Sequence, residues 1–251
     1  MASIGTGYDL SVSTYSPDGR VFQVEYANKA VDNSGTVIGL RCKDGVVLAV
    51  EKLIQSKLLV PGSNRRIHTV DRHIGLATAG LLADGKHLVG RARDEAESYR
   101  DIYHIPIPAK AISDRVGQYI SAHTLYSSVR PFGTSTILGL MDEDGPHLYQ
   151  IEPSGVYWGY SGCAAGKGKQ VARTEIEKLK LSDMTVQEAI KEAARIIHTA
   201  HDEAKDRDFE LEMTWVSEAT GGRHVPVPKE LIEEAERLAK EALNDEMEDD
   251  D

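Results

Sequence analysis

The chain has 251 residues, of which 41% are hydrophobic and 27% charged, and its formal net charge is −11. This composition is typical of a globular protein with a sizeable core, and the acidic excess argues against sequence-independent nucleic-acid binding, which needs clustered Lys and Arg. No apolar run approaches the ~18 residues of a membrane-spanning helix. Cys42 and Cys163 show neither zinc-ligand nor disulfide spacing, which favours a reducing compartment.

The first predicted elements are a proline turn and a short amphipathic helix. In Ser16-Pro17-Asp18-Gly19 the proline presets φ at the first corner, and the glycine accepts the positive φ of the exit. A helix over residues 20–31 follows, with one apolar face formed by Val21, Val24, Ala27 and Val31. Residues 1–7 have no apolar period, so we expect them to form a mobile N-terminal arm.

The remaining elements alternate in blocks of strands and helices. Strands are predicted at residues 35–42, 46–51, 67–70, 74–79, 135–141, 147–152, 156–160 and 209–216. Helical spacing is found in residues 88–103, 112–123, 171–179, 186–200 and 228–243. Because the strands cluster in hairpins, as Lys43-Asp44-Gly45 indicates, this order favours one α+β domain over residues 1–243, with antiparallel sheets and external helices. Six of the last seven residues are acidic, which predicts a disordered tail over 244–251.

Three segments carry candidate ligand chemistry. The glycine-rich Gly162–Lys169 segment invites a phosphate-loop interpretation, but its spacing is one residue short and Gly168 stands where Ser or Thr should bind magnesium. The acidic Asp142–Gly145 segment has Leu140 where a calcium loop needs its first carboxylate, so a hairpin turn is expected. His198 and His201 lie one helical turn apart near Asp202 and Glu203, and a solvated helix face is favoured over a metal site.

The whole string from Tyr8 to Ala27 resembles the signature of proteasome alpha-type subunits, and the resemblance continues to Leu243. It implies a four-layer αββα sandwich of the N-terminal nucleophile hydrolase type. It also implies a noncatalytic place in a seven-membered ring of alpha subunits, which stacks on beta subunits, gates substrate access and docks the regulatory particle or other activators. The family works in ubiquitin- and ATP-dependent protein degradation in cytoplasm and nucleus, and the resemblance implies no cofactor and no metal.

The hairpin at residues 35–49 looks like the opening hairpin of those hydrolases, whose nucleophile is an N-terminal threonine with a free amine. Laying the hairpins together puts Gly35 in the nucleophile's place, Glu51 at the carboxylate position and Arg66 at or beside the lysine position. Thr36 is one residue off, so no catalytic residue is expected. Two alternatives stay open: a self-processing threonine hydrolase cleaved before Thr36, and a binding module that takes a phosphorylated ligand at residues 162–169.

The resemblance also implies two noncatalytic sites. Tyr8, Asp9, Pro17 and Tyr26 stand where the family places a cluster that holds the N-terminal arms open, and Leu10 replaces an arginine that is often present. Arg66 falls near a lysine that meets the C-terminal carboxylate of an activator tail. An arginine there keeps the charge and adds a bidentate fork, while a solvated surface arginine is the alternative.

Overall fold

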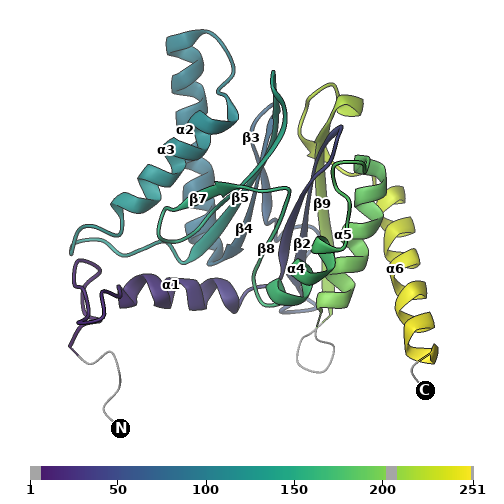
Figure 1. Ribbon diagram of the computed structural model, residues 1–251, viewed down its shortest axis with the longest axis horizontal. Coiled ribbons are helices and arrows are strands. Elements are labelled where there is room, and N and C mark those ends of the chain that lie inside the picture. Colours follow the sequence, from purple (N-terminus) through teal and green to yellow (C-terminus); the bar gives the residue numbers. More distant parts are fainter. Residues whose placement is uncertain (1–6, 202–207, 250–251) are drawn as a thin grey trace.

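The computed structural model describes residues 7–201 and 208–249. Within this part the chain forms four layers: helices, a five-stranded sheet, a second five-stranded sheet and helices (Figure 1). Every strand pair is antiparallel. The α+β sandwich predicted from the sequence is therefore confirmed.

The first sheet has the opening hairpin near its centre, in the strand order β10-β9-β2-β1-β8. Its strands are β1 (Val37–Arg41), β2 (Gly45–Leu53), β8 (Gly162–Ala165), β9 (Phe209–Ser217) and β10 (Val225–Pro226). Val46 and Leu48 of β2 contact the core between the sheets, whereas Val47 and Ala49 contact the helices. Because both faces of β2 are buried, its sequence is a continuous apolar run rather than an alternating one.

The second sheet has the order β3-β4-β5-β6-β7. Its strands are β3 (Ile67–Asp71), β4 (Ile74–Gly80), β5 (Thr134–Asp142), β6 (Gly145–Ile151) and β7 (Tyr157–Gly159). The β5–β6 hairpin pairs Asp142 with Gly145, whose φ is +107°. The acidic segment is thus a hairpin turn, as expected.

Helices cover the outer face of each sheet. α2 (Leu82–Tyr103) and α3 (Ala109–Ala122) pack on the second sheet, and α4 (Lys169–Glu177), α5 (Val186–Ala200) and α6 (Lys229–Asp249) belong to the layer on the first. α1 (Phe22–Asp32) runs across one end of both sheets in Figure 1. No helix in the described part of the chain is both long and apolar enough to cross a membrane.

Four details differ from the sequence-based expectations. Residues 162–165, for which no strand was predicted, form the edge strand β8, and β10 was not predicted either. Phe22 is buried in α1, while Val21 and Val24 are only half-buried. α6 continues to Asp249, beyond the predicted end at Leu243, because a helix that packing has nucleated extends at little further cost. Residues 1–6 of the predicted arm, and residues 250–251 of the predicted tail, lie outside the described residues.

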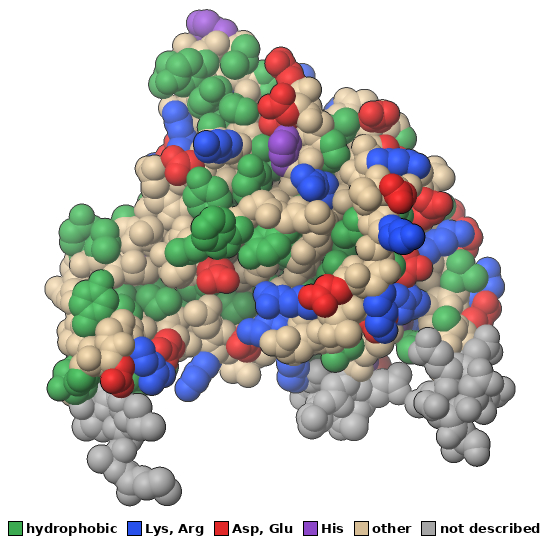
Figure 2. All heavy atoms as spheres, viewed as in Figure 1, with side chains coloured by type: hydrophobic (Ala, Val, Ile, Leu, Met, Phe, Trp, Pro, Cys, Tyr) green, Lys and Arg blue, Asp and Glu red, His purple; other side chains and the backbone are tan. Residues whose placement is uncertain are grey.

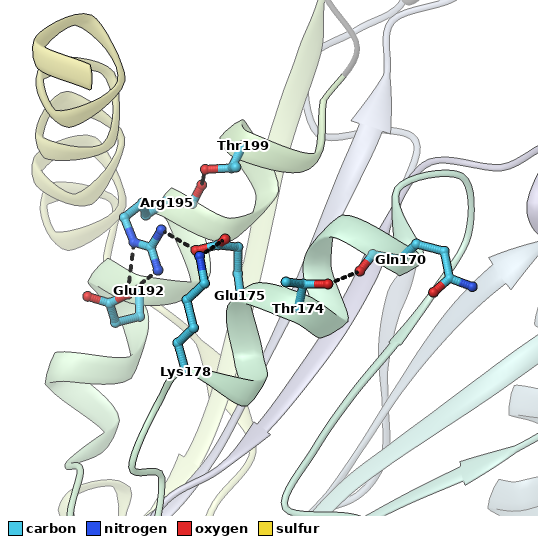
Figure 3. Close-up of polar contacts among 7 residues, drawn as sticks. All are labelled: Gln170, Thr174, Glu175, Lys178, Glu192, Arg195 and Thr199. Carbon is cyan, nitrogen blue, oxygen red and sulfur yellow. Dashed lines mark hydrogen bonds and ion pairs between the residues drawn. The ribbon is translucent and has the colours of Figure 1, made fainter. Parts of the chain in front are cut away.

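An ion-pair network joins α4 to α5 (Figure 3). The Glu175 carboxylate accepts hydrogen bonds from Lys178 Nζ at 2.5 Å and from Arg195 Nη1 at 2.8 Å, and Arg195 also binds Glu192. The hydrogen bond from Lys178, followed by that from Arg195, lowers the pKa of Glu175. The network holds α4 against α5, so it also positions the glycine-rich turn that precedes α4.

One histidine bridges the two sheets. His224 Nδ1 lies 2.8 Å from Thr69 Oγ1 of β3, and its Nε2 lies 2.8 Å from Thr214 Oγ1 of β9. A Cβ at Gly75 would lie 2.3 Å from Nε2, so only glycine leaves room for the ring there. Burial lowers the pKa of His224 to about 4, which keeps the ring neutral at physiological pH.

We expect the His224 bridge to weaken in acid. Because the unfolded chain binds a proton near pH 6.5 and the folded chain only near pH 4, stability is full above pH 6.5 and falls as the pH approaches 4. The loss attributable to this residue is up to about 3 kcal/mol. The His224→Gln variant keeps hydrogen-bonding capacity without this proton, so its urea-unfolding free energy should vary less between pH 6.5 and 4. Parallel pH profiles of variant and parent would contradict the assignment.

Candidate functional site

The position that aligns with a catalytic threonine has no room for a side chain. A Cβ at Gly35 would lie 2.1 Å from the backbone oxygen of Glu51 and 3.2 Å from its carbonyl carbon. Real Cβ atoms do not approach a backbone oxygen so closely, and the neighbouring strand cannot rotate away as a side-chain tip would. The glycine is therefore a consequence of close chain packing, and the nucleophile position is closed.

Thr36 is engaged in the interior instead of acting as a nucleophile. Its backbone N–H donates to Glu51 Oε2 at 2.8 Å, and its hydroxyl accepts from the Gly168 N–H at 3.1 Å. Thr36 has no exposed surface, and Glu51 is 3% exposed. A peptide nitrogen that donates to a carboxylate is not the free amine that such a nucleophile uses as its base.

Glu51 has a second partner that the sequence analysis missed. Nδ1 of His201, at the C-terminus of α5, lies 2.5 Å from Glu51 Oε1, and the two side chains are 8% and 2% exposed. The rings of His198 and His201 also contact Phe209, with centroids 4.9 and 4.7 Å apart. The solvated-face prediction for these histidines is wrong, because α5 turns this face toward the first sheet.

The segment before Thr36 belongs to the folded structure. Phe22, Ala27 and Val31 of α1 are buried, and Val31 contacts the core between the sheets. Cleavage before Thr36 would remove this whole helix and leave apolar surface exposed. The self-processing alternative is therefore rejected.

The glycine-rich segment does not form a phosphate cradle. The Lys167 N–H donates to Ser34 O at 3.0 Å, the Gly168 N–H to Thr36, and the Lys169 N–H to Gly166 O at 3.3 Å. Gly166 has a φ of +94°, and a Cβ there would lie 2.4 Å from Gly35 O. Two of the amides that would bind a phosphate hold Ser34 and Thr36 instead, and the third bonds within the turn.

No group of three or more potential metal-ligating side chains occurs among the residues that the structure describes. His201 contacts Glu51 and Phe209, while the His198 ring packs on Phe209 and its Nε2 lies 3.7 Å from Glu236 Oε1. Asp202 and Glu203, which were considered beside them, lie outside the described residues.

The N-terminal cluster is partly assembled within this single chain. Tyr26 Oη donates to Asp9 Oδ2 at 3.2 Å, and the Gln23 amide donates to the Asp9 carbonyl. Burial of its hydroxyl, followed by this bond to Asp9, raises the pKa of Tyr26. Tyr8 and Pro17 are exposed, and neither is brought against the Asp9–Tyr26 pair by a described contact.

The predicted proline turn precedes α1 and is confirmed. Gly19 has a φ of +75°, and its N–H donates to Ser16 O at 2.9 Å. The Arg20 N–H then donates to Ser16 Oγ at 3.0 Å. This turn fixes the direction in which the chain enters α1, and therefore the place of Tyr26.

Arg66 lies in the wall of a cavity of about 790 Å³ between the end of α1, β2 and the start of α2. Gly35, Glu51, Gly80 and Leu81 also line it. Arg66 Nη1 donates to Gly80 O at 2.7 Å. Burial lowers the pKa of Arg66 and Glu212 opposes this shift, but an arginine stays charged in proteins. The cavity therefore presents a partly buried cation beside backbone groups.

These features define an N-terminal nucleophile hydrolase framework whose nucleophile position is closed. The chain matches the proteasome subunit family over residues 31–216, and the N-terminal signature of the A-type proteasome subunits over residues 8–30. It therefore belongs to the proteasome subunit family, and it is an alpha-type, noncatalytic member of the core-particle ring.

Several relatives match along nearly the whole chain. The alpha type-3 proteasome subunit of Acanthamoeba castellanii is 66% identical over 244 residues, covering 97% of both chains. The Arabidopsis thaliana alpha type-3 subunit is 60% identical over 98% of both chains. The probable alpha type-7 subunit of Schizosaccharomyces pombe is 57% identical over 99% of this chain and 98% of its own.

The Thr36→Ala substitution tests the closed nucleophile position. We expect peptide hydrolysis per assembled core particle to be unchanged, because the hydroxyl is not a catalytic group in this chain. The free energy of unfolding should fall by about 1 kcal/mol, since the half-buried Gly168 N–H loses its acceptor. Thr36→Ser retains that acceptor and serves as the control. A large loss of rate per intact particle in the alanine variant alone would contradict the noncatalytic assignment.

Proposed function

We propose that this chain occupies the type-3 position of a seven-membered alpha ring, where it supports assembly on the beta subunits, gates substrate access and docks activators. The near full-length similarity to alpha type-3 subunits supports this position. In that position the chain would take part in ubiquitin- and ATP-dependent protein degradation in the cytoplasm and nucleus. The proposal depends on one observation: the nucleophile position at Gly35 is closed by packing, and it lies beside the open cavity that contains the Arg66 cation.

Exposed apolar side chains support contacts with neighbouring subunits. Large exposed apolar groups on a globular chain mark interaction surfaces when they gather in patches, and Figure 2 shows hydrophobic atoms gathered on the side of the arm, α2 and α3. Around the arm and the α3–β5 connection such residues are Leu10 at 89% exposure, Tyr15 at 71%, Leu125 at 60% and Tyr126 at 61%. Ring neighbours would cover these groups.

The Asp9–Tyr26 bond supports a role in gating. It fixes the start of the described chain to α1, and Gln23 adds a second attachment at the Asp9 carbonyl. We infer that this pair, with Tyr8 and Pro17, sets the direction of the arm before Tyr8 in the open gate. Leu10 provides no positive charge that could bind Asp9. The attachment of the arm to α1 therefore depends more on the Tyr26 hydroxyl than it would with an arginine at position 10.

The Tyr26→Phe substitution tests this role in assembled core particles. Loss of one exposed hydrogen bond is expected to cost about 1 kcal/mol, so activator-stimulated peptide hydrolysis should fall by about fivefold while basal hydrolysis stays unchanged. Tyr103→Phe is the matched control, because Tyr103 ends α2, its hydroxyl has no hydrogen-bond partner among the described residues, and the residue is 54% exposed. Equal effects of the two variants would remove the proposed gating role of Tyr26.

Arg66 is proposed as the group that receives the C-terminal carboxylate of an activator tail. Its guanidinium uses one N–H on Gly80 O and retains further donors for a bidentate contact. Partial burial strengthens such a contact relative to one in water. The glycine backbone at residues 35 and 80 leaves the cavity wall without side chains at those points.

A peptide with a photoreactive group near its C-terminus, prepared as free acid and as amide, tests the Arg66 site. The readout is labelling of this chain in assembled core particles, as a function of peptide concentration. We expect the free acid to bind more tightly by about tenfold, a preference that Arg66→Met abolishes and Arg66→Lys partly keeps. Unchanged acid preference in Arg66→Met would contradict the assignment of the carboxylate site to Arg66.

A further inference from the structure

An exposed arginine is connected to the Arg66 cavity through a buried carboxylate. The Arg130 guanidinium donates to both oxygens of Asp84, at 2.6 and 2.8 Å, and the Gly133 N–H donates to Asp84 Oδ2 at 2.9 Å. The Asp84 side chain is 9% exposed, whereas that of Arg130 is 65% exposed. Asp84 thus joins the start of α2 to the connection between α3 and β5.

Backbone contacts continue this path to the cavity wall. Gly133 O accepts from the Leu81 N–H at 2.9 Å, and Gly80 O accepts from Arg66 Nη1 at 2.7 Å. Gly80 has a φ of +122°, and a Cβ there would lie 2.2 Å from Gly133 O. The backbone at Gly80 and Leu81 is therefore pressed against Gly133, and any shift of Gly133 moves the carbonyl that orients Arg66.

We propose that Asp84 and Arg130 are positioning residues for the Arg66 cavity, and that the ion pair between them sets how well Arg66 meets a peptide carboxylate. This inference rests on the proposed function of Arg66 as a carboxylate site. Neither Asp84 nor Arg130 is among the residues that line the cavity, so they would act without touching a peptide bound there. They act through Gly133, Leu81 and Gly80.

The physical reason is the cost of a buried, unpaired charge. Without Arg130, the Gly133 N–H is the one hydrogen-bond donor that Asp84 keeps among the described residues. A largely buried carboxylate that loses its cation is destabilised where it stands. Rotation of Asp84 toward water relieves that cost but releases Gly133. Gly80 stays paired with Thr134 in the sheet, but the turn that follows it loses the support of Gly133, and the carbonyl that orients the guanidinium of Arg66 becomes less well fixed.

The test uses assembled core particles and the photoreactive peptide as free acid and amide. Arg130→Gln removes the charge, and we expect the preference for the free acid to fall by about fivefold or more, with the affinity for the amide unchanged. Arg130→Lys keeps a cation and should restore part of the preference. Glu95→Gln is the matched control, because Glu95 also lies on α2 and binds two arginines, Arg91 and Arg115, but has no bond to the cavity wall.

The outcomes separate this inference from the proposed function. Loss of acid preference in both Arg66→Met and Arg130→Gln, with Glu95→Gln normal, supports both. Loss in Arg66→Met but not in Arg130→Gln overturns the positioning role and leaves the Arg66 site standing. An equal loss in Arg130→Gln and Glu95→Gln overturns the inference alone. No loss in Arg66→Met overturns the proposed carboxylate site, and the inference with it. Should Arg130→Gln fail to assemble, Asp84→Asn decides: it removes the ion pair at nearly constant shape, and an acid preference equal to that of the parent would refute the positioning role.

Discussion

The Glu51 carboxylate is the interaction on which the functional end of this molecule depends. One oxygen accepts the Thr36 N–H and the other lies 2.5 Å from His201 Nδ1. A carboxylate buried at 3% exposure needs partners of this kind. The partners are Thr36, which precedes β1, and His201, which follows α5. Glu51 of β2 therefore joins three separate segments of the chain.

The same geometry that excludes catalysis shapes a binding surface. Gly35 must lack a side chain because β2 passes too close, and this glycine then leaves open the wall of the cavity that contains Arg66. Next to Gly35, the turn before α4 is bonded to the same segment, because the Gly168 N–H donates to the Thr36 hydroxyl. A hydrolase framework is thus retained for its rigidity, while its nucleophile position becomes an ordinary, well-packed part of the interior.

Rigidity at this end has sources in all layers. His224 ties the sheets to each other, the Glu175 network ties α4 to α5, and the Asp84–Arg130 pair ties α2 to the chain that leads into β5. Each of these contacts links elements that are distant in sequence. The exposed arm and the α3–β5 connection therefore project from a firm base, as surfaces for ring partners require.

The sequence by itself determined most element types, the central hairpins and the proline turn, because these depend on local signals. The missing nucleophile followed from the resemblance of the opening hairpin to that of N-terminal nucleophile hydrolases. Asp-Gly turns, the Thr185–Glu188 capping box and apolar periodicity are local in the chain, and each appears in the structure. The cluster residues Tyr8, Asp9, Pro17 and Tyr26 came from resemblance. Of these, the structure joins only Asp9 and Tyr26.

Only the tertiary structure decided the partners of Glu51, the burial of His201, the edge strand β8 and the path from Arg130 to Arg66. Each needs residues far apart in sequence, such as Glu51 and His201, to meet at hydrogen-bonding distance. No local pattern encodes such a meeting: a histidine on a helix gives the same signal whether its face meets water or a sheet. The packing of α5 on the first sheet makes that choice, because burial of its apolar face outweighs the cost of enclosing one paired histidine.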